Sequence, residues 1–353
     1  MAFGLRGERR VSTTSGSGIG NELGTPLVQV GRLHKERKGR LVMFQEKAAM
    51  FIYCVSPVHM GAGTALGAID NPIQRERHTQ HPMMMGSGIK GALRHFFSTI
   101  WADHDKNLVN RIFGPETGAS EHAGAISFSD AQIVLFPVRS LRNSFVYATC
   151  PTALARLKRL LSTLDWKTQA PSWEIPQGIE DSQCVCLNSA LKVDGASIVL
   201  ESYQFTEADQ SLKGKLELVA EWIATNALPD DQGMAYFRSK IKRDTVLLSD
   251  NRFNYFAKNA TVVEPHVRIN DETGTADDGG LFYTENLPPE SLLVSLAMAS
   301  VERKKKEENE SGRLEAEEIL EKVRTALDGE MVQMGGDATT GRGQVVLKFV
   351  ESA

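Results

Sequence analysis

Cysteine is scarce in this chain of 353 residues, and long apolar runs are missing. Four cysteines are too few for a disulfide scaffold of this length. No stretch approaches the roughly 18 apolar residues that cross a membrane. Residues 1–10 lack the apolar core of a secretory signal. We therefore expect a reduced, cytoplasmic protein with no membrane partner.

Charge of one sign does not dominate either, since 40 Lys and Arg stand against 44 Asp and Glu. Basic residues nevertheless gather at the start. Residues 1–42 hold eight Lys or Arg and three Glu, a net +5, so the rest of a chain of net charge −4 carries −9. With almost no aromatic residues to bury, this segment is predicted to be a flexible basic arm ahead of a domain at 43–353. Two alternatives stay open: a non-native extension before a true start at Met43, and a tail that binds nucleic acid.

Several common catalytic and metal-binding motifs are absent. The stretch GSGIKGALR at 86–94 is no Walker A loop, because Gly91 follows Lys90 where Ser or Thr is needed. The Gly-x-Ser-x-Gly elbow of serine hydrolases does not occur. Cys184 and Cys186 lack the second pair of ligands that a zinc site requires. We therefore predict no dedicated metal site.

Helical and strand patterns mix irregularly from residue 44 onward, which predicts an α+β fold instead of a doubly wound sheet. The expected strands are 48–55, 125–128, 132–138, 241–248, 262–270, 281–284 and 344–350. The expected helices are 88–101, capped by Ser87, then 152–163, 211–227 and 290–324, the last interrupted at 310–312. The boundaries within roughly 165–265 are the hardest to place.

Three segments contain residues that suit a phosphate-rich ligand. Asp70 precedes Asn-Pro with Arg75 downstream, so a carboxylate and a cation could act together on a phosphodiester. Lys90 and Arg94 share one face of a helix whose glycine-rich start leaves amides free for an anion. The glycine loop at 335–343 could cradle a phosphate. The plainer alternatives are a turn-forming Asp, a solvated helix face and a hairpin turn.

A softer signal lies between Phe237 and Lys258, where basic residues interleave with Phe253, Tyr255 and Phe256. Bases can stack on aromatic rings while Lys and Arg meet phosphates. An amphipathic surface with core aromatics explains the same pattern.

Taken together, residues from about 44 to 350 resemble the RAMP superfamily of CRISPR proteins, and more narrowly the repeated backbone subunit of type III-B (Cmr) effector complexes. The resemblance rests on SPVHMGAG at 56–63, GAIDNPIQRE at 67–76, GSGIKGALR at 86–94, AISFSDA at 125–131, HVRI at 266–269, GGLF at 279–282 and the final glycine loop. It implies an RRM-like (ferredoxin-like) core with large insertions, including a thumb-like hairpin. It also implies copies that stack along guide RNA as a helical filament beside other Cmr subunits, and that cleave target RNA at regular intervals in antiviral defence.

The resemblance also implies roles for single residues. The catalytic residue of such a subunit is an Asp in the loop after the first strand, and the matching position here is Asp70. His59 and Glu285 match positions near that site. RNA binding is implied for a further set of residues in these segments: Gln74, Arg75, Ser87, Lys90, Arg94, Gly335, Gly336 and Arg342.

With one suitable carboxylate, the economical reaction is attack of the RNA's own 2′-OH on the adjacent phosphorus. We expect Asp70 to orient or deprotonate that hydroxyl, and Mg²⁺, another divalent cation, or Arg or Lys to stabilise the transition state. A displaced nucleotide permits the in-line approach that a regular A-form helix prevents. The alternatives are a guide-binding scaffold without cleavage, a guide-processing ribonuclease that uses His59, and a nucleotide-binding enzyme.

Overall fold

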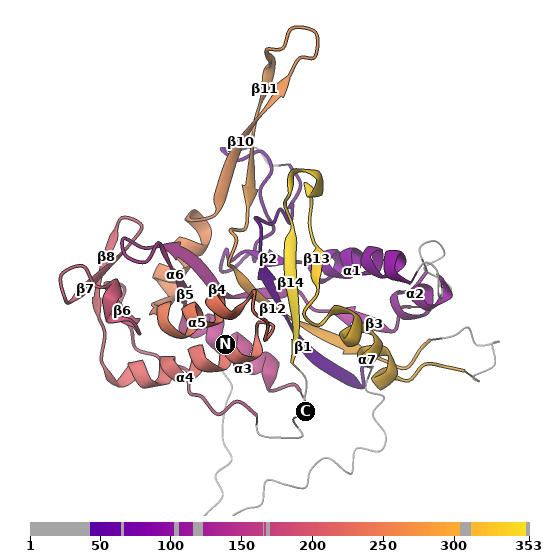
Figure 1. The fold of residues 1–353 in the computed structure, drawn as a ribbon, viewed down its shortest axis with the longest axis horizontal. Helices are drawn as coiled ribbons and strands as arrows, with labels where there is room; N and C mark the ends of the chain where they lie inside the picture. Colours follow the sequence, from indigo (N-terminus) through magenta and orange to yellow (C-terminus); the bar gives the residue numbers. More distant parts are fainter. Residues whose placement is uncertain are drawn as a thin grey trace, which may run out of the picture. The chain divides into compact units, whose positions relative to one another are not determined.

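A long sheet of mostly antiparallel strands organises the fold in our computed structural model (Figure 1). The structure describes residues 43–64, 67–101, 106–115, 123–164, 166, 170–303 and 312–350. The predicted arm, residues 1–42, lies outside the described residues. All described residues belong to one unit, Met43–Ala353.

The strand order of this sheet is β13-β14-β1-β12-β4-β5-β9-β6-β8-β7, with β2 paired to β4 and β3 to β12. Only the pairs β5–β9 and β6–β8 are parallel among the described pairs. The strands are β1 (Glu46–Cys54), β2 (Met83–Met84), β3 (Ile126–Phe128), β4 (Ala131–Arg139), β5 (Phe145–Thr149), β6 (Gln183–Cys186), β7 (Ser197–Leu200), β8 (Tyr203–Glu207), β9 (Thr245–Leu248), β12 (Leu292–Ala299), β13 (Met331–Gln333) and β14 (Gln344–Val350).

Helices cover both faces at the centre of this sheet. The helices are α1 (Gly86–Ile100), α2 (Lys106–Phe113), α3 (Pro151–Leu161), α4 (Ser211–Asn226), α5 (Ala235–Asp244), α6 (Asp250–Asn259) and α7 (Ala316–Leu327). Alternate residues of β1 enter two hydrophobic clusters. Met50 and Ile52 belong to the first cluster, and Phe51 and Tyr53 belong to the second. The first cluster contains apolar side chains of α1 and α7, and the second those of α3 and α4. Because both faces are buried, β1 is a continuous apolar run.

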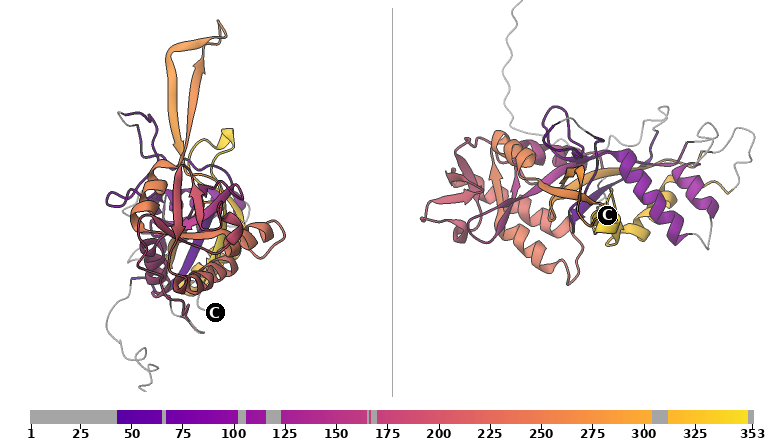
Figure 2. Two further views of the ribbon diagram at one scale, coloured as in Figure 1. Left: turned by 90° about the vertical axis from the view of Figure 1, so that its left-hand side faces the viewer. Right: turned by 90° about the horizontal axis from the view of Figure 1, so that it is seen from above.

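A second, two-stranded sheet stands apart from the first. Its strands, β10 (Val262–Ile269) and β11 (Ala276–Asn286), form an antiparallel hairpin that projects beyond the helices (Figures 1 and 2). At its foot β11 leads through a short turn into β12, near the middle of the large sheet. The hairpin is therefore anchored to the centre of the fold.

Three sequence predictions were wrong. The expected helix at 290–324 begins as β12, a strand between β1 and β4, and only α7 at its end is helical. The expected strand at 241–248 starts as the last turn of α5. Ser87 does not cap α1, which begins at Gly86, because the Gly86 amide is instead bonded to Oδ1 of Asp130 at 2.8 Å. None of the described helices has the length and apolar character needed to cross a bilayer.

Candidate functional site

The loop that carries Asp70 lies against the foot of the hairpin. The Tyr283 amide in β11 donates a 2.8 Å hydrogen bond to Oδ2 of Asp70. The next residue, Asn71, donates its amide to the Tyr283 carbonyl at 3.0 Å and accepts from the Glu285 amide at 2.9 Å. The loop thus pairs with β11 through its backbone. Asp70 is half-buried, and within the described residues no hydrogen bond reaches its Oδ1. One carboxylate oxygen is fixed and the other is available.

His59 lies beside this loop and is held by the same strand. Its Nδ1 is 2.7 Å from the Glu285 carbonyl oxygen. Because a carbonyl only accepts, Nδ1 carries the proton, and in a neutral ring Nε2 keeps its lone pair. Two glycines leave room around the residue: a Cβ on Gly61 would come within 2.9 Å of Nε2, and one on Gly335 within 2.5 Å of the His59 carbonyl oxygen. The His59 ring can therefore act as a base through Nε2.

Glu285 and Arg75 form a buried ion pair that joins the loop, the hairpin and α6. Oε1 of Glu285 is 2.5 Å from Arg75 Nη2 and 2.6 Å from the Thr261 hydroxyl, and Oε2 accepts from the Ile73 amide at 3.1 Å. The same guanidinium donates to the carbonyls of Gln80, Ala257 and Lys258 at 2.6, 3.0 and 3.1 Å. Both side chains are saturated by protein partners, so they position this region instead of facing a ligand.

Three of the predicted RNA-binding residues lie on α1, and Gln74 links the segment after β1 to the start of this helix. Gln74 donates to the Gly61 carbonyl at 3.1 Å and accepts from the Met85 amide at 2.8 Å. Ser87 is exposed in the first turn of the helix. One amide of the helix start is already engaged, because the Gly86 amide donates to the Asp130 carboxylate.

Lys90 and Arg94 follow along the same helix. Lys90 Nζ donates to the Ile126 carbonyl at 3.0 Å, and burial, with Arg94 and Arg303 nearby, lowers the pKa of its ammonium group. Arg94 donates to the Gly114 carbonyl and, at 2.7 Å, to Asn110 Oδ1. Arg94 thus fastens α1 to α2, and Lys90 is half-buried.

The glycine loop packs on His59. The Gly336 amide donates to the His59 carbonyl at 2.9 Å, and the Gly343 amide donates to the Pro57 carbonyl at 2.8 Å. Arg342 pairs with Glu264 in β10. Amides of this loop are therefore used to hold the His59 segment, and the loop is fixed to the hairpin through Arg342. The residues that sequence reasoning missed, Thr261, Glu264 and Tyr283, are the contacts on the hairpin side.

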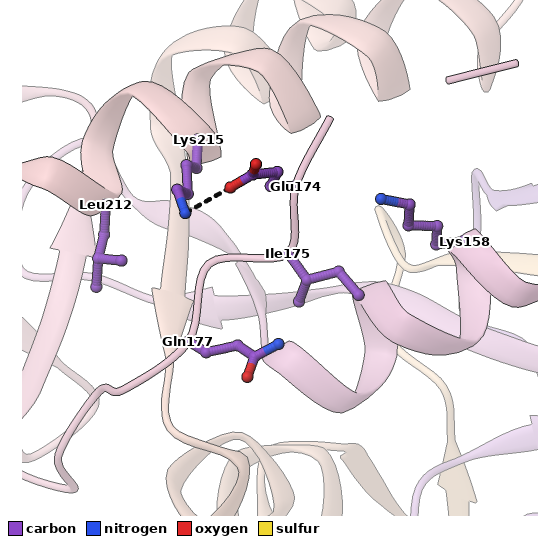
Figure 3. A pocket seen from close by; sticks show the side chains of 6 residues that line it. All are labelled: Lys158, Glu174, Ile175, Gln177, Leu212 and Lys215. Carbon is purple, nitrogen blue, oxygen red and sulfur yellow. Dashed lines mark ion pairs between the residues drawn. The ribbon is translucent and has the colours of Figure 1, made fainter. Parts of the chain in front are cut away.

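Metal binding and pockets point to no alternative centre. Across the described residues, no group of three or more His, Cys, Asp or Glu side chains is placed to hold a metal ion. A pocket of about 510 Å³ lies between α3, residues 174–177 and α4 (Figure 3). Its lysines are already engaged, Lys215 with Glu174 at 2.6 Å and Lys158 with the Trp173 carbonyl at 2.7 Å. We therefore keep the site at Asp70.

Comparison with known proteins identifies the class. Residues 51–346 match the family model described as the RAMP superfamily, and the chain belongs to that superfamily. It is 34% identical over 304 residues to the CRISPR system Cmr endoribonuclease Cmr4 of Pyrococcus furiosus, covering 85% of this chain and 94% of the relative.

Solved structures agree with this assignment. The crystal structure of oligomeric Cmr4 from Pyrococcus furiosus has a TM-score of 0.65 at 26% identity, covering 88% of this chain and all of the other. A chain in the cryo-EM structure of the type III-B Cmr-beta complex bound to cognate target RNA has a TM-score of 0.61 at 16% identity, covering 87% and 98%. This last likeness concerns the fold alone.

Proposed function

We propose that the chain is the backbone subunit of a type III-B CRISPR effector complex, which binds guide RNA and cleaves complementary target RNA. One observation carries the proposal: the Asp70 carboxylate is fixed through Oδ2 to the foot of a projecting hairpin, while Oδ1 is open. The kinship with a Cmr endoribonuclease supports it. The partners are then guide RNA, target RNA, further copies of the chain and other Cmr subunits.

An RRM-like core supports this function. The elements β1, α1, β4, β12, α7 and β14 follow one another as βαββαβ, the chain order of a ferredoxin-like fold. Their strands lie in the order β14-β1-β12-β4. An ordinary RRM binds bases on the free face of such a sheet. Here α3 and α4 pack on that face, so RNA must use the loops and the hairpin.

The β10–β11 hairpin has the properties of the thumb. Exposed apolar side chains along it include Val267 and Leu281, which are cross-strand partners, and Tyr283, two residues nearer the foot. Apolar wedges of this kind enter between base steps and unstack them. The wedge emerges next to Asp70, since the Tyr283 amide binds that carboxylate. The nucleotide displaced by the hairpin would therefore lie beside the candidate catalytic group.

The reaction that fits these groups is transesterification. Oδ1 of Asp70 or Nε2 of His59 accepts the proton of the 2′-OH, and the resulting oxygen attacks the adjacent phosphorus in line with the 5′ oxygen. The bond between phosphorus and the 5′ oxygen breaks, and the departing oxygen takes a proton from water. The products are a 2′,3′-cyclic phosphate and a 5′-OH. Glu285 positions His59 through its carbonyl and Arg75 through its carboxylate. The described residues near Asp70 form no dedicated metal site, so the predicted Mg²⁺ would be held chiefly by RNA oxygens.

The test is cleavage of end-labelled target RNA by the reconstituted, guide-loaded complex. Asp70→Asn keeps the size of the side chain and removes the carboxylate. We expect a regular ladder of products from the wild type and a rate at least about 100-fold lower from the variant, with target binding unchanged. The matched control is Asp194→Asn, because Asp194 also accepts backbone amides but lies in the turn before β7. Equal ladders from wild type and Asp70→Asn would refute the role of Asp70. Binding without a ladder from either protein would leave a scaffold.

A further inference from the structure

The α6 helix presents a solvent-exposed face of aromatic, basic and amide side chains. Residues three and four apart share one side of a helix, and on α6 that side holds Asn251, Arg252, Tyr255, Lys258 and Asn259. Tyr255 is 41% exposed. Phe253 and Phe256, which the sequence also offered for base stacking, are buried in the core. Tyr255 is therefore available to a ligand, whereas Phe253 and Phe256 belong to the hydrophobic core.

A second tyrosine and an arginine extend this face into a small platform. The Tyr203 ring in β8 packs edge-on against Tyr255 with centroids 5.1 Å apart. The Arg252 guanidinium lies 5.3 Å from the centre of the Tyr203 ring, and its Nε is anchored to the Asp181 carbonyl at 3.0 Å. Glu201 borders the cluster at the β7–β8 turn. Tyr255 is therefore supported on one side and open on the other.

The helix that carries this platform is hydrogen-bonded to the segment that follows Asp70. Arg75, which leaves that loop, donates to the carbonyls of Ala257 and Lys258 at the end of α6. Tyr255 lies less than one turn before these carbonyls, and α6 reaches the foot of the hairpin, where β10 begins (Figure 1). The Lys258 ammonium has no partner within the described residues. The exposed Tyr255 ring and the Lys258 ammonium therefore belong to the part of α6 that leads directly into the hairpin.

We propose that Tyr255, supported by Tyr203 and Arg252, is a stacking platform for an unpaired nucleotide, and that Lys258 contacts its phosphate. The inference rests on the proposed function and adds a second RNA contact beyond the loop, α1 and the glycine segment. RNA fits better than a protein partner, because an open aromatic ring with flanking cations binds single strands of any sequence. A neighbouring copy of the chain is the competing occupant.

The test uses the full chain and a fluorescein-labelled oligouridylate of about 15 nucleotides, with binding followed by fluorescence anisotropy. Stacking on one aromatic side chain accounts for about 5- to 150-fold in affinity. Because Tyr255 is only partly open, we expect Tyr255→Ala to weaken binding by about 5- to 20-fold. Tyr255→Phe keeps the ring and should bind like the wild type. The matched control is Tyr236→Ala on α5, since Tyr236 is 62% exposed and lies outside the platform.

Lys258→Ala gives an independent readout. Loss of one phosphate contact on a single strand should reduce the slope of log affinity against log salt by about 0.7. Unchanged affinity in Tyr255→Ala, or equal losses in Tyr255→Ala and Tyr236→Ala, would overturn the proposal. So would a change in oligomer mass without a change in affinity, which would assign the face to a second copy. Target cleavage by the complex is measured as well. If cleavage still depends on Asp70, a failure of the stacking proposal leaves the proposed function intact.

Discussion

At the scale of single residues, the carboxylates of Asp70 and Glu285, both at β11, differ in burial and in hydrogen bonding. Glu285 is buried, and Arg75, Thr261 and the Ile73 amide occupy its oxygens. Asp70 is half-buried and keeps Oδ1 free of hydrogen bonds from the described residues. A buried charge that is paired holds structure, whereas an accessible one can exchange protons with a substrate. We therefore propose a chemical role for Asp70 and a positioning role for Glu285.

The glycine loop offers a residue-scale prediction with an internal control. Gly335 and Gly341 both have left-handed φ angles, +88° and +82°. Alanine at either position carries a strain of about 1–2 kcal/mol. Only at Gly335 does the new Cβ also meet the His59 carbonyl oxygen, at 2.5 Å, since the space around Gly341 is open.

We therefore expect Gly335→Ala to lower the free energy of unfolding by about 1–3 kcal/mol more than Gly341→Ala. It should also slow target cleavage, because His59 is displaced. Denaturant unfolding of the full chain and cleavage by the assembled complex measure the two effects. Equal behaviour of the two variants would show that the glycine loop does not set the position of His59.

At the scale of elements, the sequence predicted the ends of the fold better than its middle. The final strand, β14, has the expected bounds, because a short apolar run rich in Val and a preceding glycine-rich turn mark it. The segment LLVSLAMA of β12 predicts a helix, because Leu, Ala and Met favour helices and a strand buried on both faces shows no alternation. The segment is a strand because it pairs with β1 and β4, and these partners are too far away in the sequence to be inferred from the segment itself.

The candidate site shows the same limit. Asp70 and the glycine segment could be selected from their own neighbours in the chain. Their contacts could not, because Tyr283 and Glu264 lie 213 and 78 residues away from their partners. The sequence predicts β10 but only the later part of β11, because the first part of β11 (Asp277-Asp278-Gly279-Gly280) is polar and glycine-rich. A strand that projects into solvent needs no apolar alternation.

The hairpin carries the prediction at this scale. The double variant Val267→Ser and Leu281→Ser removes an exposed cross-strand apolar pair, so the stability of the fold should change little. If the hairpin displaces the nucleotide at the cut, misalignment of the phosphodiester should slow cleavage by about 10- to 100-fold while guide binding persists. Cleavage rates and guide retention in the complex measure this. An unchanged rate would mean that this exposed apolar pair of the hairpin takes no part in positioning the target.

At the scale of the whole molecule, the contacts described around the candidate site all come from one chain. His59 and Asp70 come from the segment after β1, and their supports come from the hairpin, α6 and the glycine loop of the same chain. Copies in an assembly should therefore cut independently. A site shared between two copies would need both to be intact.

Complexes assembled from equal amounts of wild-type and Asp70→Asn chains distinguish these cases. With one Asp70 carboxylate acting at each site, every product of the ladder should form to about half the wild-type extent at early times, and to about a quarter if each site needs the Asp70 carboxylates of two copies. Product yields at each position, quantified on a sequencing gel, provide the measurement. A yield near a quarter would contradict a self-contained site.

The join between β11 and β12 has a mechanical consequence. The strand that lines the candidate site runs, after a few residues, into a strand hydrogen-bonded on both sides in the large sheet. A load on the hairpin would therefore pass into a strand that has a hydrogen-bonded neighbour on each side, and Arg75 also ties Glu285 of β11 to the end of α6. We expect a push from a duplex on the hairpin to act on the strand beside Asp70, because that strand joins the projection to the sheet.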